Sequence, residues 1–237
     1  EGISNIQGDF QCKDYFYVKE FVMPFIRVAG DMTIALNSGS VNTEAEIEFP
    51  NLLEIGGTLT LENNKNANNI TFPSLKKILG SCSVTTSHLK NDIEFTNLES
   101  IGTDGANAQI KFEIDGTNIL CPKLKTINGK FDITTSTVIF DMEADQVSYP
   151  NVESISENLS ITCPYSDFGS NGILSIDFSG LKSVKGISIS GQGDVTDFSS
   201  FKYLFENNVL TGESQWSVRE CAYNPTYQDM KNGKYKQ

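Results

Sequence analysis

The sequence has very little histidine and no excess of positive charge. His88 is the only histidine, so a Ser-His-Asp or Cys-His catalytic site would have to use it, and we interpret it as a solvated loop residue. Lys and Arg total 18 against 30 Asp and Glu, which gives a net charge of −12. This balance disfavours nucleic acid and anionic lipid as partners, because no surplus of cations is present to displace counterions.

Long apolar runs and targeting segments are also missing. No stretch approaches the roughly 18 apolar residues of a transmembrane helix. Residues 1–9 lack the basic and apolar regions of a signal peptide, so we expect either a cytosolic protein or a mature form whose leader has been removed. No P-loop or dinucleotide fingerprint is present, and we predict no cofactor.

One block of sequence recurs along almost the whole chain. It reads IEFPNLLEI at Ile47–Ile55, ITFPSLKKI at Ile70–Ile78, IEFTNLESI at Ile93–Ile101, ILCPKLKTI at Ile119–Ile127, VSYPNVESI at Val147–Ile155 and IDFSGLKSV at Ile176–Val184, with a degraded copy at Thr196–Leu204. From Pro50 onward the copies are spaced by 23, 23, 26, 28, 29 and 20 residues. Such a period indicates stacked coils that bury their apolar faces against one another.

Each coil contains two short patterns typical of strands. In the second coil Ile70 and Phe72 alternate with polar residues, and Pro73 ends the strand because it cannot donate to a ladder. After a corner at Gly80, Cys82 and Val84 alternate with Ser and Thr. Gly57, Gly129 and Gly186 are aligned with Gly80 as the corner glycines of their coils. We therefore predict an all-β fold, a right-handed parallel β-solenoid of seven or eight coils with two or three sheets.

Stacking turns each position of the repeat into a ladder. The aromatic ladder is predicted to contain Phe49, Phe72, Phe95, Cys121, Tyr149, Phe178 and Phe198. At one exposed position the charges alternate in the order Lys76, Glu99, Lys125, Glu153 and Lys182. Opposite charges one coil apart attract, so we interpret this ladder as structural.

The two ends of the solenoid need covers, because open strand edges invite pairing with other chains. Asp14 is expected to cap a short helix that places Tyr15, Val18 and Val22 on one stripe. Asp197 precedes a second helical pattern that ends near Asn207. We predict one solenoid domain over residues 1–213, including both caps, and a strap over residues 214–237 that packs on it.

The five cysteines are odd in number and show no CxxC spacing, which argues against a zinc or redox motif. Cys121 stands where other coils have Phe, and Cys82 stands where another coil has Leu59. We predict that these two are free thiols buried as small hydrophobes.

The stretch FPNLLEIGGTLTL at Phe49–Leu61 resembles the receptor L-domain family, and the resemblance covers residues 22–205. Members form ligand-binding lobes of animal growth-factor receptors, and others are surface leucine-rich-repeat proteins of bacteria. The ending AYNPTYQDMKNGKY at Ala222–Tyr235 is similar to that of bacterial members, which are often lipoproteins. The resemblance implies an exported protein at the cell surface or outer membrane, lipid-anchored only if a lipoprotein leader has been removed.

Two outer faces carry polar side chains at stacked positions. The first bears acids at Glu46, Glu48, Asp92, Glu94, Asp177 and Asp197. A solvated face, a cation site and the catalytic carboxylates of a polysaccharide lyase or hydrolase are the alternatives, and the absence of Arg between Arg27 and Arg219 weighs against the last. The second face bears Ser and Thr, which suit β-structure and could also offer hydroxyls to a glycan or a protein.

Function is predicted to be recognition without catalysis. The chain is interpreted as a monomeric, exported cell-surface binding or adhesion module for a protein or glycan, with no catalytic residues and no metal; the alternative is a carbohydrate-active β-solenoid enzyme. Three loops depart from the repeat, at residues 103–109, 140–145 and 164–172, and are expected to contribute to ligand binding. The predicted ligand-binding residues are Tyr165, Phe168, Asp104 and Asn107.

Overall fold

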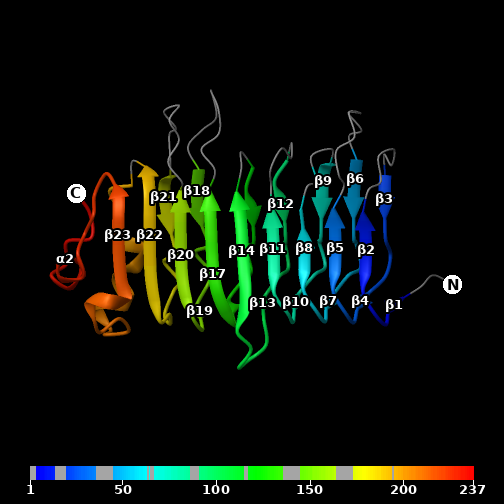
Figure 1. The fold of residues 1–237 in the computed structure, drawn as a ribbon, viewed down its shortest axis with the longest axis horizontal. Coiled ribbons are helices and arrows are strands. Elements are labelled where there is room, and N and C mark those ends of the chain that lie inside the picture. The colour runs from blue at the N-terminus through cyan, green and yellow to red at the C-terminus, as the bar shows by residue number, and fades with distance from the viewer. Residues whose placement is uncertain are drawn as a thin grey trace.

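The computed structural model describes residues 4–13, 20–35, 45–62, 64, 67–85, 91–114, 117–135, 145–163, 173–193 and 195–237. These residues form an elongated stack of parallel strands with the N-terminus at one end and the C-terminus at the other (Figure 1). The predicted parallel β-solenoid is confirmed.

Three long sheets run along the stack. Sheet A contains β1 (Asn5–Ile6), β4 (Arg27–Val28), β7 (Glu54–Ile55), β10 (Lys77–Ile78), β13 (Ser100–Ile101), β16 (Thr126–Ile127) and β19 (Ser154–Ile155). Sheet B contains β2 (Phe10–Lys13), β5 (Met32–Ala35), β8 (Leu59–Leu61), β11 (Cys82–Thr85), β14 (Ala108–Ile114), β17 (Gly129–Thr135), β20 (Asn158–Cys163), β22 (Gly186–Gly193) and β23 (Trp216–Cys221). Sheet C contains β3 (Glu20–Val22), β6 (Ala45–Glu48), β9 (Ala67–Thr71), β12 (Ile93–Glu94) and β15 (Ile119–Leu120), and β18 (Asp145–Ser148) and β21 (Ile173–Asp177) pair at the same place in later coils.

The strands succeed one another in triplets, one from each side of the coil, on seven successive levels from β1 to β19. The solenoid thus makes about six turns, fewer than the seven or eight coils predicted. In Figure 1 the near strands of sheet B run upward while the coils advance from the N-terminal end at right to the C-terminal end at left, so the winding is right-handed. Sheet A is formed by the final residues of each repeat block, such as Lys77–Ile78 of ITFPSLKKI, for which no strand was predicted from the sequence. Its strands are only two residues long, too short for a visible alternation.

The aromatic ladder fills the space between the sheets. Phe49, Phe72 and Phe95 are fully buried and stacked, with ring centroids 5.1 and 5.2 Å apart. Tyr149 and Phe178 continue the buried column, as predicted, with centroids 5.7 Å apart. The column departs from the prediction at its end, because the ring that stacks on Phe178 belongs to Phe201, whereas Phe198 contacts Trp216 and Tyr223.

Cys121 leaves room in the column that the facing sheet fills. Phe112 and Phe131 of sheet B pack at 6.0 and 5.5 Å from the Tyr149 ring. Larger side chains on one sheet therefore compensate for the small thiol on the other, which keeps the core close-packed. Cys82 and Cys121 are buried and free, as predicted.

Glycine corners let neighbouring coils approach closely. A Cβ on Gly80 would lie 2.6 Å from the carbonyl carbon of Gly57, and one on Gly129 would lie 2.0 Å from the Ala108 oxygen. Both contacts are with backbone, so no side chain can move aside to relieve them. The corners thus require glycine for spacing between coils rather than for a left-handed conformation.

Neighbouring coils are also joined by the side chains that directly follow the proline of the repeat block, or the residue that replaces it. Asn97 Nδ2 donates to the Pro73 carbonyl, Asn151 Nδ2 donates to the Pro122 carbonyl at 2.9 Å, and Ser74 Oγ donates to the Pro50 carbonyl at 2.6 Å. These bonds satisfy carbonyls that the tight turn leaves outside the sheet ladders. Part of the predicted charge ladder forms ion pairs: Glu153 pairs with Lys182 at 3.0 Å and with Lys125 at 4.0 Å.

The C-terminal end is closed by helices and by the tail. A 3₁₀ turn at Ser199–Phe201 leads into α1 (Lys202–Glu206), which Asn207 terminates as predicted. After a second 3₁₀ turn at Glu213–Gln215, the tail adds β23 to sheet B and then forms α2 (Tyr227–Lys231), seen at the far left of Figure 1. Trp216 anchors this tail: its side chain is buried, and its ring centroid lies 5.1 Å from that of Phe205.

The N-terminal end differs in part from the expectation. Most of the helix expected from Asp14 lies outside the described residues. Val22, which was placed on its apolar stripe, instead belongs to β3 and pairs with Glu48 of β6. Its β-branched side chain is 44% exposed on the outside of sheet C.

Candidate functional site

The predicted ligand-binding residues are only partly within the described structure. Asp104 and Asn107 are exposed on the connection between β13 and β14, where the Ala106 N–H donates to the Thr103 carbonyl at 3.0 Å. Gly105 has a φ of +77° in this turn. Tyr165 and Phe168 lie outside the described residues, as do His88 and most of residues 140–145. Neither Asp104 nor Asn107 lines the hollows described below.

The acidic face is formed by the outside of sheet C. Its carboxylates are partly engaged by neighbouring coils: Asp92 accepts the Asn118 N–H at 2.6 Å, and Glu46 accepts the Asn68 amide. None of the five strands of this sheet carries a Lys or Arg. Within the described part of the chain, no group of three or more His, Cys, Asp or Glu is placed to hold a metal ion.

Asp177 and Asp197 lie beside a shallow hollow of about 470 Å³ further along the stack. Each carboxylate accepts the N–H of the serine two residues later, at 2.9 Å for Asp177 and 2.7 Å for Asp197. Partial burial raises the pKa of Asp197, but the hydrogen bonds from Ser199 and the nearby Lys236 outweigh it and hold that pKa below its ordinary value. These two carboxylates therefore accept backbone hydrogen bonds within their own turns.

The outer face of sheet B is a flat polar surface. One row across its nine strands contains Gln11, Thr33, Thr60, Ser83, Lys111, Asp132, Ser160, Ser188 and Ser217. In the middle of the face charged side chains pair with one another, while the exposed Lys13 of β2 and Arg219 of β23 add a positive charge at each end. Lys111 donates to Glu113, and this contact, with a hydrogen bond from Thr85, lowers the pKa of Glu113. Between the centre and these ends, hydroxyl groups occupy most of the outward positions.

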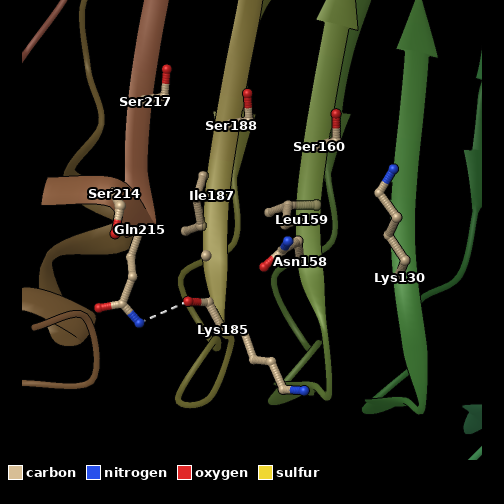
Figure 2. A pocket seen from close by; sticks show the side chains of 11 residues that line it. Lys130, Asn158, Leu159, Ser160, Lys185, Ile187, Ser188, Ser214, Gln215 and Ser217 are labelled. Atoms are coloured by element: carbon tan, nitrogen blue, oxygen red, sulfur yellow. Dashed lines mark hydrogen bonds between the residues drawn. The ribbon is translucent and has the colours of Figure 1, made fainter. Parts of the chain in front are cut away.

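A hollow of about 530 Å³ opens in this face near its C-terminal end. Figure 2 shows its lining, in which Ser160, Ser188 and Ser217 follow one another across β20, β22 and β23. In the row beside these serines, Asn158 and Gln215 flank Gly186, which has no side chain. The hollow opens over Gly186, from which no side chain projects.

Gln215 is held rigidly as one wall of the hollow. Its Nε2 donates to the Lys185 carbonyl at 2.9 Å (Figure 2), and its Oε1 accepts the N–H groups of Thr211 and Gly212 at 2.7 and 3.0 Å. The tail thus builds one side of the hollow with a side chain whose hydrogen bonds are satisfied internally. The opposite side is formed by Asn158 and, one strand further, Lys130.

The two lysines of the hollow are neutralised by carboxylates. Lys130 pairs with Asp132 of the same strand at 2.9 Å, and Lys185 pairs with Glu157 of the preceding coil. Both ammonium groups are substantially exposed, so the pairs are weak and screened by salt. The local charge of the hollow is consequently close to zero.

The alignment of Gly186 with the corner glycines was wrong by one residue. In successive coils the corner position is occupied by Gly129, Glu157 and Lys185. The Glu157 N–H donates to the Gly129 carbonyl at 3.2 Å, and the Lys185 N–H donates to the Glu157 carbonyl at 3.0 Å. Gly186 therefore occupies the next, outward-facing position, paired with Asn158. The hydroxyl face could be predicted from the sequence, but this hollow could not, because it depends on the register and on a tail strand that the repeat does not predict.

Comparison with protein-family models, with curated proteins and with solved structures found no match for the chain. Among the residues that the structure describes, no helix is long and apolar enough to cross a membrane.

Proposed function

We propose that the protein is a non-catalytic recognition module that binds an extended glycan across the outer face of sheet B. The observation that carries this proposal is the composition of that face, on which hydroxyls fill most outward positions between a small centre of paired charges and the single cations Lys13 and Arg219 at its ends. Strand spacing places successive hydroxyls roughly 4.8 Å apart, so the face offers regularly spaced donors and acceptors to a polymer.

The distribution of exposed apolar side chains favours a glycan over a protein partner. Among the described residues, the large apolar side chains that are exposed are Val22, Ile26, Leu53, Leu120 and Tyr203. None belongs to a strand of sheet B. Protein interfaces depend on buried aromatic and apolar anchors at their centre, and this face offers none for that role. A hydrated, hydroxyl-rich ligand needs no such anchor.

The resemblance to the receptor L-domain family supports a place for this module at the cell surface. Members of that family are exported and use stacked coils to present ligand-binding surfaces. Exposure at the surface would bring sheet B into contact with extracellular or envelope polysaccharides. Attachment to a membrane is part of the proposal only if the natural precursor carries a lipoprotein leader.

A glycan array run beside a panel of matrix proteins tests the proposal. The variant Thr162→Arg with Ser190→Arg places two long cations on neighbouring strands of sheet B, since these residues pair in register. We expect it to abolish glycan binding. Thr126→Arg, which faces outward on sheet A, is the matched control and should bind normally. Binding to a matrix protein alone would contradict the glycan proposal.

The same preparation should be incubated with each bound polysaccharide and examined for released products. If the protein cleaves a polysaccharide, and Asp92→Asn or Glu94→Gln abolishes that cleavage, the protein is an enzyme rather than a recognition module. Its active carboxylates would then lie on sheet C.

A further inference from the structure

We infer that the hollow above Gly186 seats a single neutral sugar unit of the ligand and anchors it on the face. This inference rests on the proposed function and assigns the position and chemical class of one subsite. The hollow lies on the face proposed to bind a glycan, and its volume of about 530 Å³ lies within the roughly 300–1,000 Å³ typical of small-ligand sites.

The shape of the hollow depends on the missing side chain. Gly186 lies between Asn158 and Gln215 in the row, and a Cβ added to it would be 3.1 Å from Asn158 Oδ1 and 3.4 Å from the Gln215 carbonyl oxygen. The gap is narrow, so the sugar ring stays above it and only a single hydroxyl group reaches down between these two residues toward the backbone of β22. Elsewhere in this row side chains such as Lys130 fill the corresponding space.

The lining matches the polar groups of a sugar. Asn158 offers both amide donors and a carbonyl acceptor, while Ser188 and Ser217 offer hydroxyls that donate and accept. Gln215 is already fixed by its internal hydrogen bonds, so little ordering is required of that wall when a ligand binds. Closely placed donors and acceptors of both kinds suit the vicinal hydroxyls of a sugar ring.

Charge selects a neutral unit over an acidic one. Lys130 and Lys185 already pair with Asp132 and Glu157, so an anionic sugar would exchange one ion pair for another with little gain. The net charge of −12 would also repel an acidic polysaccharide as it approaches. Binding should accordingly vary little with salt, since no unpaired charge is used.

Gly186→Ala tests the subsite directly. The added methyl group contacts mainly the exposed Asn158 side chain, which can move, so the variant should fold. Gly8→Ala is the matched control, because a Cβ there meets nothing within 4 Å. The probes are neutral and uronic-acid oligosaccharides on an array, followed by titration of bound ones at low and high salt. We expect Gly186→Ala to weaken neutral-glycan binding roughly tenfold or more, as an obstructed subsite does.

The outcomes separate this inference from the proposed function. Glycan binding that survives Gly186→Ala but is lost with Thr162→Arg and Ser190→Arg overturns the subsite and leaves glycan recognition standing. Binding confined to acidic glycans, weakening as salt rises, overturns the neutral class. If the unmodified protein binds no glycan at all, both the proposed function and the subsite are overturned.

Discussion

Replacing Phe95 with Ala should destabilise the protein by about 3–5 kcal/mol, the range for large-to-small changes of buried aromatics. Phe95 is fully buried, and on one side its ring stacks on Phe72 at 5.2 Å with an interplanar angle of 14°. Phe72 cannot shift into the gap without leaving Phe49, against which it stacks at 5.1 Å. On the other side Cys121 is too small to fill the space. We therefore expect the cavity to persist.

Urea unfolding, followed by circular dichroism, measures this loss of stability. The midpoint urea concentration should fall, while the dependence of the unfolding free energy on urea (the m-value) stays unchanged. The matched control is Leu120→Ala, one coil along on the outside of sheet C, where the side chain is 39% exposed. Its effect should stay within about 0.5 kcal/mol. A loss below about 1 kcal/mol for Phe95→Ala would show that the ring is not part of a close-packed column.

Three further predictions concern the core and the tail. Tyr149→Phe should stabilise the fold by about 1–2 kcal/mol in the same assay, because the buried Tyr149 hydroxyl has no hydrogen-bond partner among the described residues and so incurs an uncompensated desolvation cost; destabilisation would reveal a partner. Cys82 and Cys121 should react with a thiol reagent only after denaturation, since burial raises the pKa of both thiols; immediate labelling would contradict their burial. Asp229→Asn should lower the melting temperature near neutral pH, because hydrogen bonds from Thr226 at the start of α2 lower the pKa of Asp229. A carboxyl with a depressed pKa stabilises the fold above its unfolded pKa of about 3.9 and loses that effect as pH falls through the folded pKa, so the two proteins should melt alike in strong acid; a difference that persists there would point to another cause.

The repeat by itself determined the class of fold and most of the core. Ile, Phe and Leu recur at a period that only stacked coils can bury, so the ladder through Phe49, Phe72 and Phe95 could be predicted without coordinates. The alternating charges around Glu153 followed from the same alignment. Such patterns are local and periodic, and periodicity is what a single sequence displays.

The tertiary structure decided the features that depend on register and on distant segments. Gly186 resembles the corner glycines in sequence, but the backbone ladder through Glu157 and Lys185 moves it to an outward position and opens the hollow. The tail shows no repeat, yet Trp216 pairs with Ile187 and extends sheet B by a ninth strand. A one-residue shift reverses the face on which a strand residue lies, and pairing across 29 residues leaves no periodic trace. For that physical reason the fold could be predicted from the sequence, whereas the candidate site required the packed structure.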